Sequence, residues 1–369
     1  MSQEVRAMRF GLYTEVQLHP GKSPEQMYGE VLEQIVNADR LGYDVYAAIE
    51  HFFFPKFSIS ANPLALFAAA AQRTKRIRFR TMLHALPYWN PMVLASMIAV
   101  EEILTDGRYE FGVGRGHGWI PEKAGVPLDE HARPRYEEAV DLLFEALSSE
   151  RFSHSGEYFQ VADSHIVPFP TGTFRVTLGG TSDRTYELAA QNGWSVAVPP
   201  LLPYVALEKQ LDLYRERCAE HGTTPDIVWI HACHLDEDRD TALREARDWT
   251  VGFIKGNCSP LTEHEKPPTD GLLKADYGFY AAGIMEQLNE IPYEQLVEED
   301  YIWVGTPDDV AERIEQTLEI CPGIGEIAIT CNAGGIDHWM AIKNQELFMS
   351  RVAPRFGAET RAEAVEATA

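Results

Sequence analysis

The sequence lacks the features that mark a secreted, zinc-binding or membrane-spanning protein. Five cysteines occur in 369 residues, with no C-x-x-C pair and no zinc-like spacing. The first residues, MSQEVRAM, contain no apolar stretch of a signal peptide, and runs such as LALFAAAA at 64–71 are shorter than the roughly 20 residues that cross a bilayer. We therefore expect free thiols, no metal site, and a soluble cytoplasmic protein.

Basic side chains are also scarce. The chain has 32 Lys and Arg residues against 56 Asp and Glu residues, which leaves a formal net charge of −24. A chain with this balance repels phosphate backbones and anionic lipid headgroups. The composition predicts neither a nucleic acid nor a membrane as a general partner.

The common nucleotide-binding and hydrolase motifs are absent. The stretch Gly112–Gly118 alternates glycines, but it fails G-x-G-x-x-G because His117 and Trp119 stand at the required third positions. Residues 21–23 resemble the end of a P-loop, yet Val16 occupies the place of its first glycine. H-E-x-x-H and G-x-S-x-G do not occur either. A Rossmann site, a P-loop, a zinc protease and a serine hydrolase are therefore unsupported.

What the sequence does have is a regular alternation of strands and helices. Strands are predicted at 9–14, 45–49, 77–86, 109–113, 175–178, 194–198, 227–231 and 326–330. Helices are predicted between them, several opened by a capping residue followed by proline, as in Ser23-Pro24. Eight strands in this rhythm predict a (β/α)₈ TIM barrel. An open doubly wound sheet is the alternative, although the pattern does not split into two halves.

The predicted barrel occupies residues 1–352 as one domain. Residues 152–159 resemble a small hairpin, and 257–300 lose the rhythm and hold prolines, glycines and charges. Because the 257–300 segment follows the seventh strand, on the face where barrel enzymes place their chemistry, we expect a lid-like insertion. The acidic, alanine-rich residues 353–369 are expected to form a flexible tail.

Two glycine-bearing loops after the fourth and fifth strands predict a phosphate site. Arg115 stands between two glycines and supplies a forked donor. The second loop contains Gly180, Thr181 and Ser182 and runs into a helix, whose free amides and dipole attract anions. The alternative for Ser182 is an ordinary helix N-cap.

A candidate acid–base pair, Glu50-His51, stands where the second strand gives way to an aromatic loop. A histidine there is either a satisfied structural residue or a catalytic one at the active face. The phenylalanines at 52–54 either pack in the core or wall an apolar pocket. His84 is a weaker candidate on the same face, with Glu15, His231 and His234 also expected near it. His231 and His234 point in different directions along an extended chain, which argues against a shared metal ion.

Two helices, at 63–73 and 91–104, are apolar nearly all round. Outer helices of a barrel should have a polar face. Their composition indicates a second buried surface, most simply that of a homodimer. Burial beneath the hairpin or the tail is the alternative.

With these residues in place, the chain resembles the bacterial luciferase-like flavin monooxygenases from Met8 to about Arg351. The segments that carry the resemblance are EHFF at 50–53, ANPLALFAAAAQRTKRIRF at 61–79, LPYWNPMVLA at 86–95, LTDGRYEFGVGRG at 104–116, GGTSDRTYELAAQNGW at 179–194 and VGTPDDVAERI at 304–314. The resemblance implies reduced FMN supplied by a separate flavin reductase, together with molecular oxygen. The peroxyflavin that forms would oxidise an aldehyde, ketone, sulfonate or related small organic molecule.

The resemblance also implies site residues. The family's active-site histidine falls on His51, and its phosphate-binding arginine falls on Arg115. We expect Glu50 to orient either His51 or the local backbone. The hydroxyl cluster falls on Ser182 and Thr185, with Thr181 where the luciferases carry glutamate. A non-proline cis peptide beside the isoalloxazine would fall at about Met82-Leu83.

The chain departs from the luciferases at two positions. Phe52 replaces the second histidine of their E-H-H-F motif, and Gly114 stands in place of their reactive cysteine. The resemblance therefore does not extend to luciferase-like light emission.

Two other functions remain open. The first is a deazaflavin-dependent dehydrogenase or reductase of the same superfamily, whose longer cofactor tail would favour further cations near Arg115; the sequence shows none there. The second is a metal-dependent barrel hydrolase, which usually has H-x-H at the end of the first strand. Here that position reads Tyr13-Thr14-Glu15.

Overall fold

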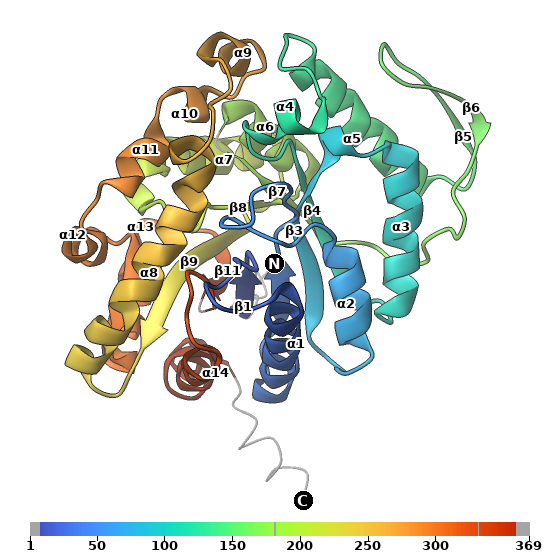
Figure 1. Ribbon diagram of the computed structural model, residues 1–369. Coiled ribbons are helices and arrows are strands. Elements are labelled where there is room, and N and C mark those ends of the chain that lie inside the picture. Colours follow the sequence, from blue (N-terminus) through green and yellow to red (C-terminus); the bar gives the residue numbers. More distant parts are fainter. Residues whose placement is uncertain (1–7, 181, 331, 359–369) are drawn as a thin grey trace, which may run out of the picture.

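The computed structural model describes residues 8–180, 182–330 and 332–358 and shows a closed parallel barrel surrounded by helices (Figure 1). Strands follow one another in the order β1-β2-β3-β4-β7-β8-β9-β11, and the β8–β9 and β11–β1 pairings close the ring. The predicted (β/α)₈ barrel is confirmed, and the open sheet is excluded. The barrel strands are β1 (Arg9–Thr14), β2 (Val45–Ala48), β3 (Arg78–Ala85), β4 (Tyr109–Gly114), β7 (Val176–Gly179), β8 (Ser195–Ala197), β9 (Ile227–Leu235) and β11 (Ile324–Thr330).

The helices around the barrel begin where the capping signals predicted. Ser23 caps the first of them in a capping box with Gln26, and Gly42 ends it in the left-handed conformation at φ 97°. Asn62, Asn90 and Thr306 cap three others, each followed by proline. The main helices are α1 (Pro24–Leu41), α2 (Pro63–Ala71), α3 (Pro91–Leu104), α4 (Ile120–Ala124), α5 (Ala132–Ser148), α6 (Asp183–Asn192), α7 (Glu208–His221), α8 (Arg239–Thr262), α13 (Pro307–Ile320) and α14 (His338–Leu347).

The chain between β9 and β11 is helical rather than irregular. The helix α8 continues to Thr262, inside the stretch at 257–300 where the sequence pattern loses its rhythm, and four short helices follow before β10 (Ile302–Gly305), which pairs with β9 outside the barrel. These helices are α9 (Thr269–Lys274), α10 (Gly278–Ala281), α11 (Ile284–Asn289) and α12 (Tyr293–Glu298); together we call them the α9–α12 segment. Each is too short to produce a recognisable 3.6-residue period in the sequence.

Two peripheral elements differ in extent from the predictions. The hairpin strands are β5 (Phe152–Ser155) and β6 (Gln160–Ser164), and this hairpin stands away from the barrel (Figure 1). At the other end, residues 353–356 form a turn of 3-10 helix, and Ala353 is fully buried. The packed chain therefore continues beyond 352, where the tail was expected to begin.

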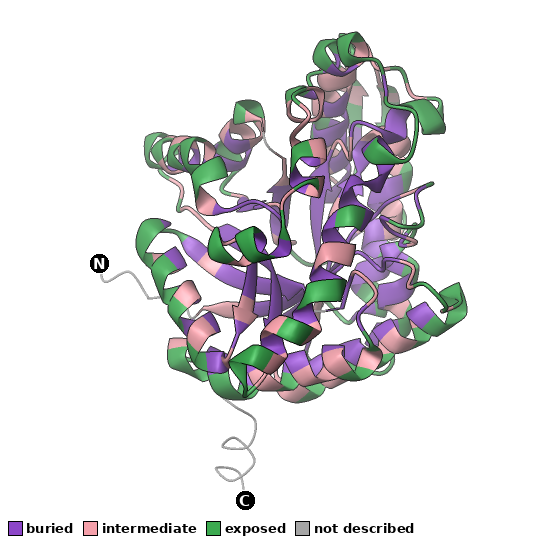
Figure 2. Cartoon of the chain, turned by 60° about the vertical axis from the view of Figure 1, so that its left-hand side comes forward, coloured by how far each residue is buried: buried purple, intermediate pink, exposed green. Residues whose placement is uncertain are grey.

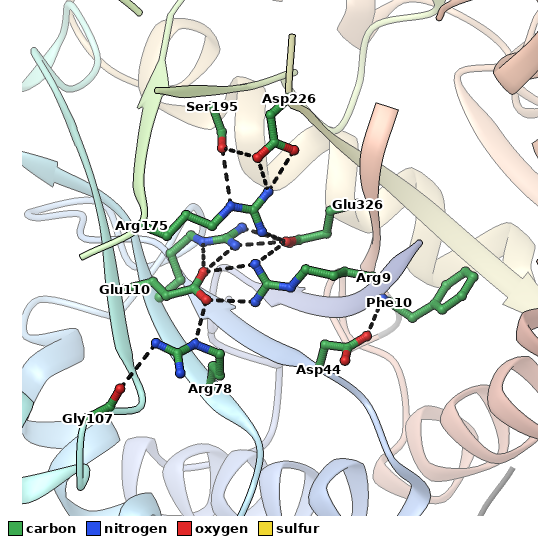
Figure 3. Close-up of polar contacts among 11 residues, drawn as sticks. Arg9, Phe10, Asp44, Arg78, Gly107, Glu110, Arg175, Ser195, Asp226 and Glu326 are labelled. Atoms are coloured by element: carbon green, nitrogen blue, oxygen red, sulfur yellow. Dashed lines mark hydrogen bonds and ion pairs between the residues drawn. The ribbon is translucent and has the colours of Figure 1, made fainter. Parts of the chain in front are cut away.

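A network of charged side chains fills the barrel at the amino ends of its strands (Figure 3). Arg80 is fully buried and lies 2.6 Å from Glu110 and 2.7 Å from Glu326. Arg9 and Arg175 add further ion pairs to the same two carboxylates. Burial acts to raise the pKa of Glu326, but the pairs with Arg80 and Arg175 outweigh it and lower that pKa. This network leaves the opposite end of the barrel for a binding site.

The strands and the inner faces of the helices form the buried core (Figure 2). Cys218, Cys258 and Cys321 are free and lie inside it, as expected of those three thiols. Among the described helices, none combines the length and the apolar character needed to cross a membrane.

Candidate active site

A cavity of about 670 Å³ opens at the carboxyl ends of the barrel strands. Its walls come from residues at or after the ends of β1, β2, β3, β4, β7 and β8, and from the α9–α12 segment, which contributes Tyr277, Phe279, Tyr280, Met285 and Leu288. Barrel enzymes place their chemistry on this face.

One end of the cavity gathers cations and hydroxyls, as the two glycine loops predicted. Ser182 stands at the N-cap position of α6, yet its side chain caps no amide of that helix. Its hydroxyl instead accepts from Arg133 Nη2 at 2.9 Å and lies 3.0 Å from Thr185 Oγ1. The ordinary N-cap alternative therefore does not hold. Arg115, Gly180 and Thr185 line the same cavity. We call Arg115, Arg133, Ser182 and Thr185 the anion site; Thr181 lies outside the described residues.

The α9–α12 segment binds both arginines of the anion site. Arg115 donates to the carbonyl oxygens of Ala275 and Asp276, each at 2.5 Å, and its guanidinium lies 4.2 Å from the ring centre of Tyr277. The Asp276 carboxylate pairs with Arg133, and Asp276 itself is in the left-handed conformation at φ 59°. An incoming phosphate would meet a carboxylate already paired with Arg133.

The cis peptide bond that the resemblance implied is present at Met82-Leu83, and both residues line the cavity. Leu83 also explains the glycines of the neighbouring strands. A Cβ at Gly114 would lie 2.6 Å from Leu83 Cδ2, and one at Gly179 would lie 2.5 Å from the same atom. A larger residue at position 114 would therefore require the Leu83 side chain to move.

Glu50 contacts a backbone amide and two other side chains rather than His51. Glu50 accepts from His84 Nδ1 at 2.9 Å, from the Ala85 amide at 3.1 Å and from Trp89 Nε1 at 2.7 Å. His84 engages its other ring nitrogen with the hydroxyl of Tyr109 at 2.8 Å. Both nitrogens of His84 and the carboxylate thus have partners, so Glu50 ties β2 to β3, and His84 does not line the cavity.

His51 lies behind the cavity wall rather than in it. Its side chain is fully buried, stacks on Phe57 with ring centres 4.0 Å apart, and accepts at Nε2 from Trp119 Nε1 at 3.1 Å. Burial, and then the neighbouring His117, lower the pKa of His51 well below its usual value. The phenylalanines at 52–54 do not line the cavity: Phe54 is buried in the core and Phe53 is mostly exposed.

The imidazole that does line the cavity belongs to His117. It stacks on Trp119 with ring centres 4.5 Å apart and meets His51 edge-on at 5.3 Å. Burial lowers the pKa of His117 to about 3, so the ring is neutral. Sequence reasoning treated His117 only as the residue that breaks a glycine motif. Its position two residues after Arg115, on a strand-end loop, was the signal that could have identified it.

The other end of the cavity contains a buried acid, Glu15, directly after β1. Its carboxyl oxygens accept from Tyr13 Oη at 3.2 Å, Gln17 Nε2 at 3.3 Å and Asn257 Nδ2 at 2.8 Å. Burial raises the pKa of Glu15 to about 8, against the effect of these donors. Glu15 is therefore mostly protonated at neutral pH.

The remaining histidines of the predicted face serve packing. His231 packs against Trp303 with tilted rings whose centres are 4.2 Å apart, and neither His231 nor His234 lines the cavity. His234 lies between Glu245 and Trp249, 3.1 Å from each. Within the described ranges no three His, Cys, Asp or Glu side chains converge as a metal site requires.

Comparisons with known proteins agree with this architecture. The chain is 24% identical to the alkanal monooxygenase alpha chain of Photobacterium leiognathi, over 91% of this chain and 95% of the relative. The fold matches the oxygenating constituent of 3,6-diketocamphane monooxygenase from Pseudomonas putida, solved with FMN, at a TM-score of 0.75 and 24% identity over 95% and 99% of the two chains. It also matches an F420-dependent secondary alcohol dehydrogenase at a TM-score of 0.71 and 19% identity, over 95% and 100%. The family model for luciferase-like monooxygenases matches residues 8–320, and the chain belongs to that family.

Proposed function

We propose that this protein is an FMNH₂- and O₂-dependent monooxygenase that receives reduced FMN from a separate flavin reductase and oxidises a small organic molecule. The anion site at one end of the cavity carries the proposal, because it fits a phosphate monoester. The structural relative described as an oxygenating constituent in complex with FMN supports both the cofactor and a two-component system.

The residues of the cavity fit this cofactor. Arg115, Ser182 and Thr185 would hold the phosphate, the backbone at Gly180 allows its close approach, and Arg133 adds a second guanidinium. Met82 and Leu83 present the cis peptide bond and apolar side chains to the cavity between the two ends, where a ring system would lie.

When bound, reduced FMN supplies the electrons that activate oxygen. The chain itself would position the cofactor and the substrate, shield them from water, and provide hydrogen-bonding groups at the reacting atoms. The neutral His117 ring can accept a hydrogen bond at one nitrogen and donate its N–H at the cavity wall. His51 acts indirectly, because it fixes Trp119, on which His117 stacks. Tyr277 and Tyr280 cover the cavity from the α9–α12 segment and exclude water.

A pair of histidine variants separates these roles. His117→Ala should lower substrate oxidation by roughly 10-fold, as loss of one hydrogen bond to a reacting group does, and raise hydrogen peroxide formation. His51→Ala should lower it less, because His117 remains. FMN affinity should stay unchanged in both, since neither residue belongs to the anion site. If His117→Ala oxidised the substrate normally while His51→Ala released hydrogen peroxide instead of product, the catalytic role would return to His51.

Oxygen incorporation tests the proposal itself. Protein, FMN, a flavin reductase and NADH are mixed under ¹⁸O₂ with aldehydes, ketones and sulfonates, and products are analysed by mass spectrometry. One labelled oxygen atom per product, dependent on FMN and on the protein, is the expected result. Turnover that proceeds without oxygen would contradict it.

A deazaflavin-dependent dehydrogenase is the second candidate, and one observation favours it. The sequence showed no cations near Arg115, but the fold brings Arg133 to the anion site and Arg184 to the cavity wall. Acidic partners offset both, since Arg133 pairs with Asp276 and Arg184 pairs with Glu137. We therefore keep FMN as the proposed cofactor; binding of FMN and F420 under the same conditions compares the two directly.

We further propose that the chain forms a homodimer through α3. Its outer face exposes Val93, Val100, Ile103 and Leu104, which helical spacing places along one side. The apolar side chains of α2 turn inward instead, with Leu64, Leu66 and Phe67 buried.

A further inference from the structure

The cavity has two chemically different ends on opposite sides of the barrel. In the closed ring, β7 lies four strands from β1, so Ser182 after β7 and Glu15 after β1 stand across the mouth from each other. Arg115, after β4, belongs to the first side. If the proposed function holds and a cofactor phosphate occupies the anion site, the Glu15 end is the part of the cavity left for the substrate.

No positive charge accompanies the acid at this second end. Glu15 is 1% exposed, and its three donors are a phenol and two amides, from Tyr13, Gln17 and Asn257. Among the described residues that line the cavity, the only cationic side chains are Arg115 and Arg184, both on the anion side.

Apart from Glu50, whose carboxylate accepts from His84, Ala85 and Trp89, the cavity walls on this side are largely apolar. Ile49 of the β2 end and Ile230 of β9 line the cavity, and Met285 and Leu288 of α11 line it from above. A ligand here exchanges water for hydrocarbon walls, with a carboxyl group and a phenol as hydrogen-bonding partners. An anion would lose its hydration without gaining an ion pair, at a cost of several kcal/mol.

From this distribution of charge we propose that the substrate is an uncharged, largely apolar molecule with a hydrogen-bond-accepting oxygen, as in a ketone or an aldehyde, that Glu15 binds this oxygen, and that the lack of a cation at this end of the cavity excludes sulfonates and carboxylates. The protonated carboxyl of Glu15 can donate to a carbonyl oxygen, whereas its ionised form cannot. Because the pKa of Glu15 is about 8, binding of a ketone should weaken as the pH rises through that value.

Matched ligand pairs test this inference by binding rather than by turnover. Camphor is compared with camphor-10-sulfonate, and 2-octanone with 1-octanesulfonate, by calorimetry on the full chain with oxidised FMN present, at pH 6.5 and pH 9. The neutral member of each pair should bind at least roughly 100-fold more tightly at pH 6.5, the ratio that a penalty of a few kcal/mol gives. Wild type should also bind each ketone more weakly at pH 9 than at pH 6.5.

Glu15→Gln keeps a neutral donor at every pH. It should retain ketone binding and lose the pH dependence. Glu263→Gln, which removes a half-exposed carboxylate outside the cavity, is the matched control and should behave as wild type. Circular dichroism verifies that both variants are folded.

Equal or tighter binding of the sulfonates would overturn the inference, as would failure of both members of both pairs to bind at millimolar concentration. A pH dependence that persists in Glu15→Gln would remove Glu15 from the role. FMN binding, measured in the same samples, separates this inference from the proposed function: loss of FMN binding contradicts the cofactor assignment, whatever the ligands do.

Discussion

Burial of Glu15 makes a quantitative prediction about stability. The pKa of its carboxyl is raised from 4.5 to about 8 in the folded protein. Above pH 4.5 the unfolded chain therefore releases this proton while the folded chain keeps it, so wild type loses stability as the pH rises, until the folded pKa is reached. The slope is about 1.36 kcal/mol per pH unit, which accumulates to on the order of 4 kcal/mol by pH 8.

Glu15→Gln removes the titration and keeps a similar shape. The amide oxygen can still accept from Asn257, and the amide nitrogen can donate to the hydroxyl of Tyr13. Its free energy of unfolding should therefore rise relative to wild type by roughly 2–3 kcal/mol between pH 6 and pH 8. Every other titrating group is common to both proteins and cancels in the difference.

Urea unfolding at pH 5, 6, 7, 8 and 9 measures this difference. Fluorescence midpoints and slopes give the free energy of unfolding of each protein, with Glu263→Gln as the control for loss of one negative charge. The gap between Glu15→Gln and wild type should widen up to about pH 8 and then level off. Parallel curves across the range would show that Glu15 titrates normally, and the argument from burial would fail.

Three further outcomes follow from the anion site and from α3. Arg115→Ala should weaken FMN binding by roughly 1.5–3 kcal/mol and leave riboflavin, which has no phosphate, unaffected; an equal loss for both ligands in flavin titrations would place the arginine elsewhere. Asp276→Asn should tighten FMN binding several-fold, because the carboxylate that pairs with Arg133 is half-exposed and contributes at most about 1 kcal/mol; weaker binding would show that it does not compete. Ile103→Glu should convert a dimer into a monomer in sedimentation velocity, whereas Val167→Glu, at an exposed apolar residue outside α3, should not; a monomeric wild type would refute the interface.

The choice of Ile103 shows what only the structure could supply. From the apolar run at 91–104 alone, Ala95 in the middle of the helix appears a suitable position for a disruptive charge. Ala95 is fully buried against the barrel, so a glutamate there would damage the fold and report nothing about assembly. Periodicity is weak when both faces of a helix are apolar, and it then cannot tell the inner face from the outer one.

The sequence predicted the barrel well because its signals are local. Capping residues, prolines and glycines set the ends of α1, α2, α3 and α13, and runs of β-branched and aromatic residues set the strands. The loops that carry Arg115 and Ser182 could be recognised for the same reason, since glycine next to an arginine or a hydroxyl residue is a short-range pattern.

The roles of the histidines could not be read in this way. Whether His51 or His117 faces the cavity depends on how Phe57 and Trp119 pack around them, and these residues are brought together only by the closed barrel. Arg133 presents the same difficulty, because it lies on a helix well removed in sequence from Ser182. Such contacts follow from tertiary packing, to which no short motif corresponds.

The charged network at the amino ends of the strands determines from which side small molecules can reach the cavity. Arg80 and its two buried carboxylates, with Arg9 and Arg175 around them, fill the barrel at that end. The barrel interior is therefore blocked at the amino ends of its strands, and small molecules reach the cavity from the carboxyl ends. If the proposed function holds, cofactor, substrate and product would all pass through the opening at the carboxyl ends of the strands, beside the α9–α12 segment.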